Sequence, residues 1–210
     1  MSQAYKSTLY GLAALLYVIT CISAAERPHI IFIVADDLGW NDVGWNNPEM
    51  QTPHIDELAK NGIIMNQSYV QPMCTPSRAA FMTGYYPYHI GRQNCVVIVL
   101  EPTGVSVKYP FLSQKLKELR YSTHIIGKWH LGHCNESYTP TRRGFDSFLG
   151  FYYAEGDYYT HKIESSVQVW REILDFHRNL EPTNDYNGIY TTVRNFSILL
   201  SLSGRGCPVA

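Results

Sequence analysis

The stretch from Pro28 to Ala35 constrains the fold of this chain more than any other segment. It is a continuous apolar and β-branched run, Pro-His-Ile-Ile-Phe-Ile-Val-Ala, without polar alternation. Such a run is typical of a strand buried on both faces of a parallel sheet. The chain has 210 residues, 45% of them apolar, which is enough for one substantial core. We therefore expect an α/β fold with a mostly parallel central sheet.

Two carboxylates, Asp36 and Asp37, follow this run directly. Ligands of open α/β sheets bind at the carboxyl ends of the strands. Adjacent carboxylates are costly there unless a cation or hydrogen bonds compensate them. Hard oxygen ligands suit Ca²⁺ or Mg²⁺, so the pair is a candidate metal site. A solvated turn with an aspartate cap is the alternative for an isolated Asp-Asp pair.

Helix and strand signals alternate further along the chain. Thr52-Pro53 begins a predicted helix that stops at Asn61-Gly62, and Ile63 to Val70 is a predicted strand. Pro110 to Leu119 has the pattern of an amphipathic helix, and Tyr121 to Ile126 follows as a strand. This alternation fits the α/β class.

The segment Pro72 to Gly84 is dense in reactive groups, with the sequence Pro-Met-Cys-Thr-Pro-Ser-Arg-Ala-Ala-Phe-Met-Thr-Gly. Thr75 and Pro76 predict the N-cap and first residue of a helix, which places Cys74 just before its N-terminus. The exposed N–H groups and the helix dipole favour an anion there. Arg78 lies one helical turn after Cys74, so its guanidinium can point back to the same place.

Cys74 has several possible roles when this segment is considered alone. A buried structural cysteine is the ordinary role of a single thiol, and a disulfide is the ordinary role in a secreted chain. A cysteine-dependent phosphatase needs a longer spacing than the three residues between Cys74 and Arg78. Lys128 and His130, after the predicted strand, are by themselves ordinary surface residues.

Taken together, the motifs resemble the type I sulfatases. Cys74 to Arg78, followed by two apolar residues, a Thr and a Gly, resembles the modification site of that family. Gly127 to Gly132 resembles its second motif, although Arg120 stands where that motif usually has Gly. Thr139 to Tyr152 is most similar to the arylsulfatase B group. The resemblance covers roughly Arg27 to Thr192.

The resemblance implies an alkaline-phosphatase-like sandwich, of which this chain is the N-terminal part. It implies that Cys74 is oxidised to formylglycine by the formylglycine-generating enzyme, and that Arg78, Lys128 and His130 are catalytic. Asp36, Asp37 and the modified Cys74 are the implied ligands of one Ca²⁺. The implied reaction is hydrolysis of sulfate esters, with N-acetylgalactosamine 4-sulfate in glycosaminoglycans as the substrate suggested by the arylsulfatase B group.

The implied site is incomplete in this sequence. The downstream Asp-Asn pair, a further His and a further Lys of the family have no counterpart, and residues 193–210 form a divergent tail. Two aspartates supply at most about four of the roughly 6–8 oxygens that Ca²⁺ prefers. We therefore expect little or no activity, and a non-catalytic truncated product or sulfated-glycan binder is the alternative. A phosphoester hydrolase of the related alkaline-phosphatase-like superfamily is a further alternative.

Residues 1–25 have the pattern of a secretory signal peptide. Lys6 precedes an apolar run from Leu9 to Ile22, and small residues follow at Ser23 to Ala25. A retained signal anchor is the alternative, and no later stretch is long and apolar enough for a membrane span. The expected location is the secretory pathway, lysosomal or secreted. A formal charge of −1 predicts no nucleic-acid partner.

Four cysteines remain after the signal peptide, and spacing alone does not pair them; they are Cys74, Cys95, Cys134 and Cys207. Three acceptor sequons for N-glycosylation begin at Asn66, Asn135 and Asn195. Asn135, in a polar loop, is the favoured acceptor, whereas Asn66 lies in a predicted strand.

Overall fold

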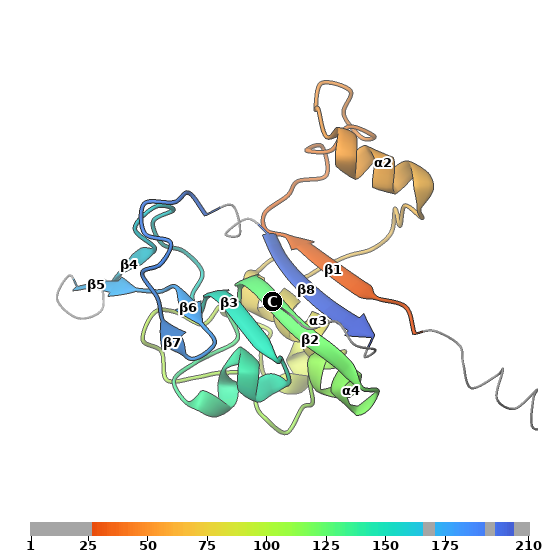
Figure 1. The fold of residues 1–210 in the computed structure, drawn as a ribbon. Coiled ribbons are helices and arrows are strands. Elements are labelled where there is room, and N and C mark those ends of the chain that lie inside the picture. The colour runs from red at the N-terminus through yellow and green to blue at the C-terminus, as the bar shows by residue number, and fades with distance from the viewer. Residues whose placement is uncertain (1–26, 166–170, 192–195, 204–210) are drawn as a thin grey trace, which may run out of the picture.

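A computed structural model describes residues 27–165, 171–191 and 196–203 (Figure 1). A six-stranded sheet has the order β1-β8-β2-β3-β6-β7, and β4 pairs with β5 in a separate sheet. The strands are β1 Ile30–Ala35, β2 Tyr121–Lys128, β3 Ser147–Phe151, β4 Lys162–Ser165, β5 Arg171–Leu174, β6 His177–Arg178, β7 Glu181–Pro182 and β8 Phe196–Ser203. The helices are α2 Pro53–Asn61, α3 Cys74–Thr83 and α4 Leu112–Glu118, with short 3₁₀ helices η1 Pro87–Ile90, η2 Glu136–Tyr138 and η3 Pro140–Arg143.

The α/β class is confirmed, but the expectation of a mostly parallel sheet is wrong for the described residues. Only β2 and β3 pair in parallel there, whereas β8 is antiparallel to both of its neighbours, β1 and β2. Strands β1, β2 and β3 nevertheless run in one direction, because β1 and β2 each oppose β8. Their carboxyl ends therefore meet at one edge of the sheet.

Strand β8 comes from the divergent tail and separates β1 from β2 (Figure 1). Its backbone pairs Ile198 with Ile33 on one side and with Ile126 on the other. The run Phe196-Ser-Ile-Leu-Leu-Ser consists of apolar and hydroxylated residues, which suit a strand. The tail strand thus pairs with both neighbouring strands, while the outer edge of β1 has no paired strand among the described residues.

One face of the six-stranded sheet packs on α3 and α4 and holds the core. Phe32 of β1 meets Phe81 of α3 edge to face, with ring centroids 5.6 Å apart. Trp129 is fully buried between Phe111 and Phe145. These aromatic contacts attach the helices to the strands that lead into the site.

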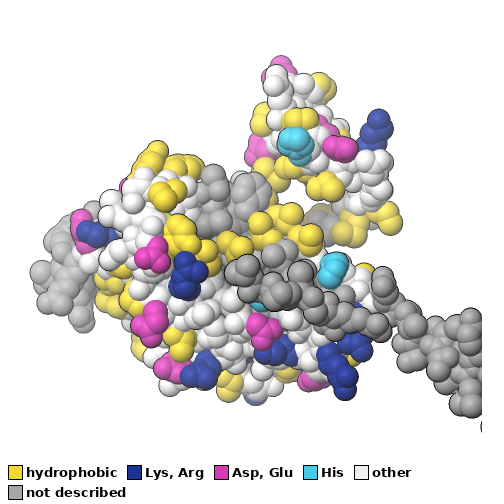
Figure 2. Space-filling view, viewed as in Figure 1, with side chains coloured by type: hydrophobic (Ala, Val, Ile, Leu, Met, Phe, Trp, Pro, Cys, Tyr) yellow, Lys and Arg dark blue, Asp and Glu magenta, His cyan; other side chains and the backbone are white. Residues whose placement is uncertain are grey.

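The opposite face is largely open at β1, so the expectation that this strand is buried on both faces is wrong here. Ile31 and Ile33 are 64% and 53% exposed. Hydrophobic side chains accordingly form a visible patch between the α2 region and the main body (Figure 2). A helix layer is what normally covers such a face in an α/β sandwich, and the described residues include none at this place.

Several local predictions match the structure and two do not. The helix after Thr52 ends at Asn61 as expected, but Ile63 to Val70 contains no strand. Helix α3 begins at Cys74 itself, with Met73 as N-cap, and so starts earlier than predicted. Arg120 has φ of 61°, a left-handed conformation that favours glycine, which explains the family preference at this turn.

The predicted signal peptide lies outside the described residues. Within the described part, no helix combines the length and apolar character needed to cross a membrane.

Arg143, in η3, connects the segment after β2 to the core through its buried side chain. Its side chain lies over the Phe111 ring, 3.6 Å from the centroid, and donates hydrogen bonds to the carbonyls of Val105 and Tyr109 at 2.9 and 2.7 Å. The residue is 1% exposed. Its neighbour Arg142 is exposed and pairs with Glu136.

We expect the two adjacent arginines to differ sharply in their effect on stability. Arg143→Ala leaves one buried and one partly buried carbonyl without this donor and removes packing on Phe111, so the free energy of unfolding should fall by about 3 kcal/mol. Arg142→Ala should change it by less than about 0.5 kcal/mol, because exposed ion pairs contribute little. Urea unfolding followed by tryptophan fluorescence measures both, and equal losses would contradict this account.

Candidate active site

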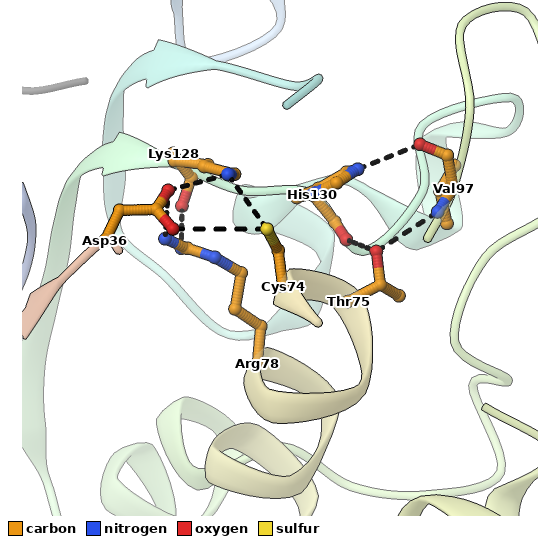
Figure 3. A network of polar contacts seen from close by, with 7 residues as sticks. All are labelled: Asp36, Cys74, Thr75, Arg78, Val97, Lys128 and His130. Carbon is orange, nitrogen blue, oxygen red and sulfur yellow. Dashed lines mark hydrogen bonds and ion pairs between the residues drawn. The ribbon is translucent and has the colours of Figure 1, made fainter. Parts of the chain in front are cut away.

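The site forms where two strand ends meet the start of a helix. Asp36 directly follows β1, Lys128 is the last residue of β2, and Cys74 is the first residue of α3. Lys128 Nζ donates to Asp36 Oδ2 at 2.6 Å and to Cys74 Sγ at 3.3 Å (Figure 3). The thiol lies 4.0 Å from Asp36 Oδ1. Residues 92 positions apart in sequence are thus in direct contact.

Arg78 completes this group from the next turn of α3. Its Nη2 lies 3.5 Å from Asp36 Oδ2, and its Nη1 donates to the Lys128 carbonyl at 2.5 Å. Burial lowers the pKa of Arg78, while the charge of Asp36 partly opposes that shift. We refer to Asp36, Cys74, Arg78 and Lys128 as the Cys74 cluster. It places two cations beside one carboxylate and one thiol.

The start of α3 presents backbone donors beside Cys74. Met73, the N-cap, gives the helix no side-chain cap, and the chain enters it in an extended conformation. Pro76 has no N–H to satisfy, which suits the first helical turn. Because the first N–H groups of a helix lack helical acceptors, this end favours a negatively charged group near the thiol.

Thr75 does not cap the helix as the sequence predicted. Its hydroxyl donates to the His130 carbonyl at 2.9 Å and accepts from the Val97 N–H at 3.1 Å. Thr75 is fully buried and joins three separate segments. The sequence did not predict this role, because the position of Thr75 directly after Cys74 does not indicate which distant segments its hydroxyl will contact.

His130 lies beside the cluster with its ring turned to Val97. Its Nε2 is 2.9 Å from the Val97 carbonyl (Figure 3), and Nδ1 is buried without a hydrogen-bond partner in the described part of the chain. The residue is fully buried and has a left-handed φ of 57°. Burial first, and then the charge of Lys128, lower the pKa of His130 to about 4. The imidazole is therefore neutral near neutral pH.

Asp37 lines the same hollow but lies at its exposed rim. A cavity of about 470 Å³ is lined by Asp36, Asp37, Cys74, Arg78 and the outer part of β1. A larger hollow of about 570 Å³ beneath α2 has no ionisable side chain in its lining, so it is no candidate for this chemistry. Only the hollow at Cys74, among those in the described part of the chain, combines a thiol with charged side chains in its lining.

The described residues supply only part of a calcium site. Asp36 and Asp37 have the hard oxygens that Ca²⁺ prefers, but they offer at most about four of the roughly 6–8 needed. Asp36 is also engaged by Lys128 and Arg78. No group of three or more His, Cys, Asp or Glu side chains suited to a metal occurs in the described ranges. The donor set therefore does not fit a complete site.

Comparison with known proteins decides the family. A family model described as Sulfatase matches residues 28–184. The chain belongs to the sulfatase family. The predicted membership is thus confirmed, and all four residues of the Cys74 cluster lie within the matched range. Their individual roles stay predictions.

Named sulfatases match this chain over a limited part of their length. Arylsulfatase J of Mus musculus is 45% identical over 171 residues, which are 81% of this chain and 28% of the relative. Steryl-sulfatase of Homo sapiens is 42% identical over 60% of this chain and 24% of its own length. N-acetylgalactosamine-6-sulfatase of Rattus norvegicus is 32% identical over 71% and 30%, respectively. The chain spans less than a third of each.

Solved sulfatase-type structures share the fold of this chain. The crystal structure of Ps i-CgsB in complex with k-i-k-neocarrahexaose has a TM-score of 0.65 and 35% identity, covering 74% of this chain and 37% of that one. The PsFucS1 sulfatase from Pseudoalteromonas sp. has a TM-score of 0.50 and 33% identity, covering 61% and 26%. The sulfatase chain described here is therefore a partial α/β domain of that type.

The buried neutral His130 makes stability sensitive to acid. Its folded pKa of about 4 lies below the ordinary 6.5, so the unfolded chain binds a proton that the folded chain excludes between these values. The contribution of His130 is fully present above about pH 6.5 and is lost toward pH 4, by up to about 3 kcal/mol.

Unfolding free energies of the wild type and His130→Gln across this pH range measure that contribution. The glutamine amide can still donate to the Val97 carbonyl, so the variant should fold. The slope of its unfolding free energy against pH should be smaller than that of the wild type by the contribution of about one proton. His177, whose pKa burial also lowers to about 4, contributes equally to both curves. Identical slopes would contradict the assignment.

Proposed function

We propose that the domain represented by this chain hydrolyses sulfate esters, with Cys74 as the precursor of the reactive group. The observation that carries the proposal is the contact of Lys128 with both Asp36 and Cys74 at the start of α3. Arg78, one turn further, adds a second cation. A thiol with two cations and a helix N-terminus beside it suits an anionic substrate such as a sulfate monoester.

A formylglycine at position 74 would supply a hydrated aldehyde, with one hydroxyl as the nucleophile toward sulfur and a second whose deprotonation would release sulfate and restore the aldehyde. The residues of the chain orient and stabilise this chemistry. Lys128 is proposed to neutralise the charge of the sulfate oxygens. Arg78 is proposed to position the end of β2, through the Lys128 carbonyl, and to stabilise charge on the group at position 74. His130, which is neutral, is proposed to exchange a proton with the hydroxyl that expels sulfate after its ring turns from Val97.

A divalent cation, Ca²⁺ in the proposal, belongs to the complete domain. Asp36 and Asp37 are its proposed ligands here, together with modified Cys74, and the remaining ligands are absent from this sequence. We assign no step to the cation in this chain, because the described donors do not complete its coordination. A non-catalytic product that binds sulfated glycans is the second candidate, and the incomplete donor set favours it.

The proposed substrates are sulfate esters of sugars. One relative bears the name N-acetylgalactosamine-6-sulfatase, and one structural neighbour contains a neocarrahexaose. N-acetylgalactosamine 4-sulfate in glycosaminoglycans is the specific substrate we propose. The formylglycine-generating enzyme is the proposed partner, and the secretory pathway, with a lysosomal or secreted product, is the proposed location. N-glycosylation at Asn135 fits that route, because Asn135 lies exposed in a turn before η2.

We expect conversion of Cys74 to formylglycine in cells that contain the modifying enzyme. The chain should be purified from such cells, digested, and each cysteine peptide analysed by mass spectrometry. The Cys74 peptide should carry the aldehyde, whereas the peptides of Cys95 and Cys134, which lack the motif, should retain thiols or thiol derivatives. An unconverted Cys74 alongside a co-expressed sulfatase that is converted would refute the proposed reactive group.

The purified 210-residue chain should nevertheless have little or no sulfatase activity, because its metal ligands are incomplete. Release of a chromogenic alcohol from an aryl sulfate measures this, with the Cys74→Ala variant as background. A rate well above that background would show that the residues present suffice for turnover.

A further inference from the structure

The carboxylate of Asp36 is already neutralised by the protein itself. Lys128 Nζ and Arg78 Nη2 both approach Oδ2, at 2.6 and 3.5 Å. The second oxygen, Oδ1, faces the Cys74 thiol at 4.0 Å. Lys128 and Arg78 set two positive charges against this one carboxylate, and the adjacent, exposed Asp37 brings the hollow only to neutrality. A hollow without net negative charge gives a divalent cation no net electrostatic attraction.

The ammonium of Lys128 is held in this position from several directions. Its side chain is 5% exposed, and its backbone carbonyl accepts a hydrogen bond from Arg78. Lys128 ends β2, where it pairs with Phe151 of β3. The ammonium therefore contacts Asp36 from a rigid strand end, and the contact joins two strands that do not pair with each other.

A cation on Asp36 would have to share this space. Ca²⁺ binds carboxylate oxygens at about 2.3–2.6 Å, which is the distance at which Lys128 Nζ already lies from Oδ2. The two cations would then be close neighbours in a largely buried place, where repulsion is poorly screened. The exposed Asp37 offers the cation no compensating cage among the described residues.

We infer that Lys128 is the resident counter-cation of Asp36 in this chain, so that the Cys74 cluster assembles without a divalent cation and admits one only after Lys128 is displaced. In this chain the Cys74 cluster is on this account metal-independent in its architecture. The inference concerns the unmodified protein and needs no substrate, so it stands or falls separately from sulfate ester hydrolysis.

Calcium binding to the full chain with unmodified Cys74 tests the inference. Titration calorimetry and thermal unfolding should be run in EDTA and in Ca²⁺ up to about 10 mM, above the 10⁻⁴–10⁻³ M range of weak extracellular sites. The wild type should show no shift in Tm between the two. Lys128→Met removes the competing charge, and its affinity for Ca²⁺ should be at least about tenfold tighter than that of the wild type.

Lys117→Met is the matched control, because it removes the same charge from an exposed pair with Asp146 and should leave calcium affinity unchanged. A wild-type Tm that rises with Ca²⁺ would overturn the inference. So would a folded Lys128→Met variant, confirmed by near-ultraviolet circular dichroism, that binds Ca²⁺ no better than the wild type.

A second measurement on the wild type covers the case in which Lys128→Met does not fold. The rate of Cys74 alkylation by iodoacetamide should be the same in EDTA and in Ca²⁺, because Lys128 contacts the thiol in either condition. The exposed Cys95 and Cys134 report on general reactivity in the same digest. A calcium-dependent change at Cys74 alone would show that the cation, and not Lys128, organises the site.

Discussion

The contact between Lys128 and Asp36 is the interaction on which the site depends. It connects the carboxyl ends of β1 and β2, which have β8 between them and share no backbone hydrogen bonds. The same ammonium reaches Cys74, so one side chain joins two strands and a helix. Charge-assisted hydrogen bonds are shorter and stronger than neutral ones, and burial increases their effect. Arg78 of α3 supports the same carboxylate from the helix that carries Cys74.

The directions of the strands in the sheet make that contact possible. Three strands that point the same way are brought together by a fourth, β8, that opposes two of them. Antiparallel pairing with β8 satisfies one side of the β1 backbone and leaves β1 as an edge strand of the described sheet. One face of β1 is also open, with Ile31 and Ile33 exposed. An exposed apolar edge strand is a known route to association.

The residues of the site were largely predictable, but their contacts were not. Asp36, Cys74, Arg78 and Lys128 follow from motif and spacing, and the structure brings all four together. His130 was expected to be catalytic, and motif spacing gave no indication that its ring would bond to Val97. Thr75 was expected to cap a helix and instead joins His130 to Val97. Side-chain partners from distant segments depend on packing, which spacing within one motif does not encode.

By itself, the sequence determined the α/β class, the sulfatase motifs and the positions at which charged residues follow strands. These features are local, because hydrophobic patterns and short motifs are set by neighbours along the chain. Only the tertiary structure decided that the tail strand β8 enters the sheet between β1 and β2. It also decided that Lys128 forms an ion pair with Asp36, the carboxylate expected to bind metal. Both outcomes are long-range: strand order and ion pairing depend on which distant segments are present to compete for the same backbone groups and the same charge.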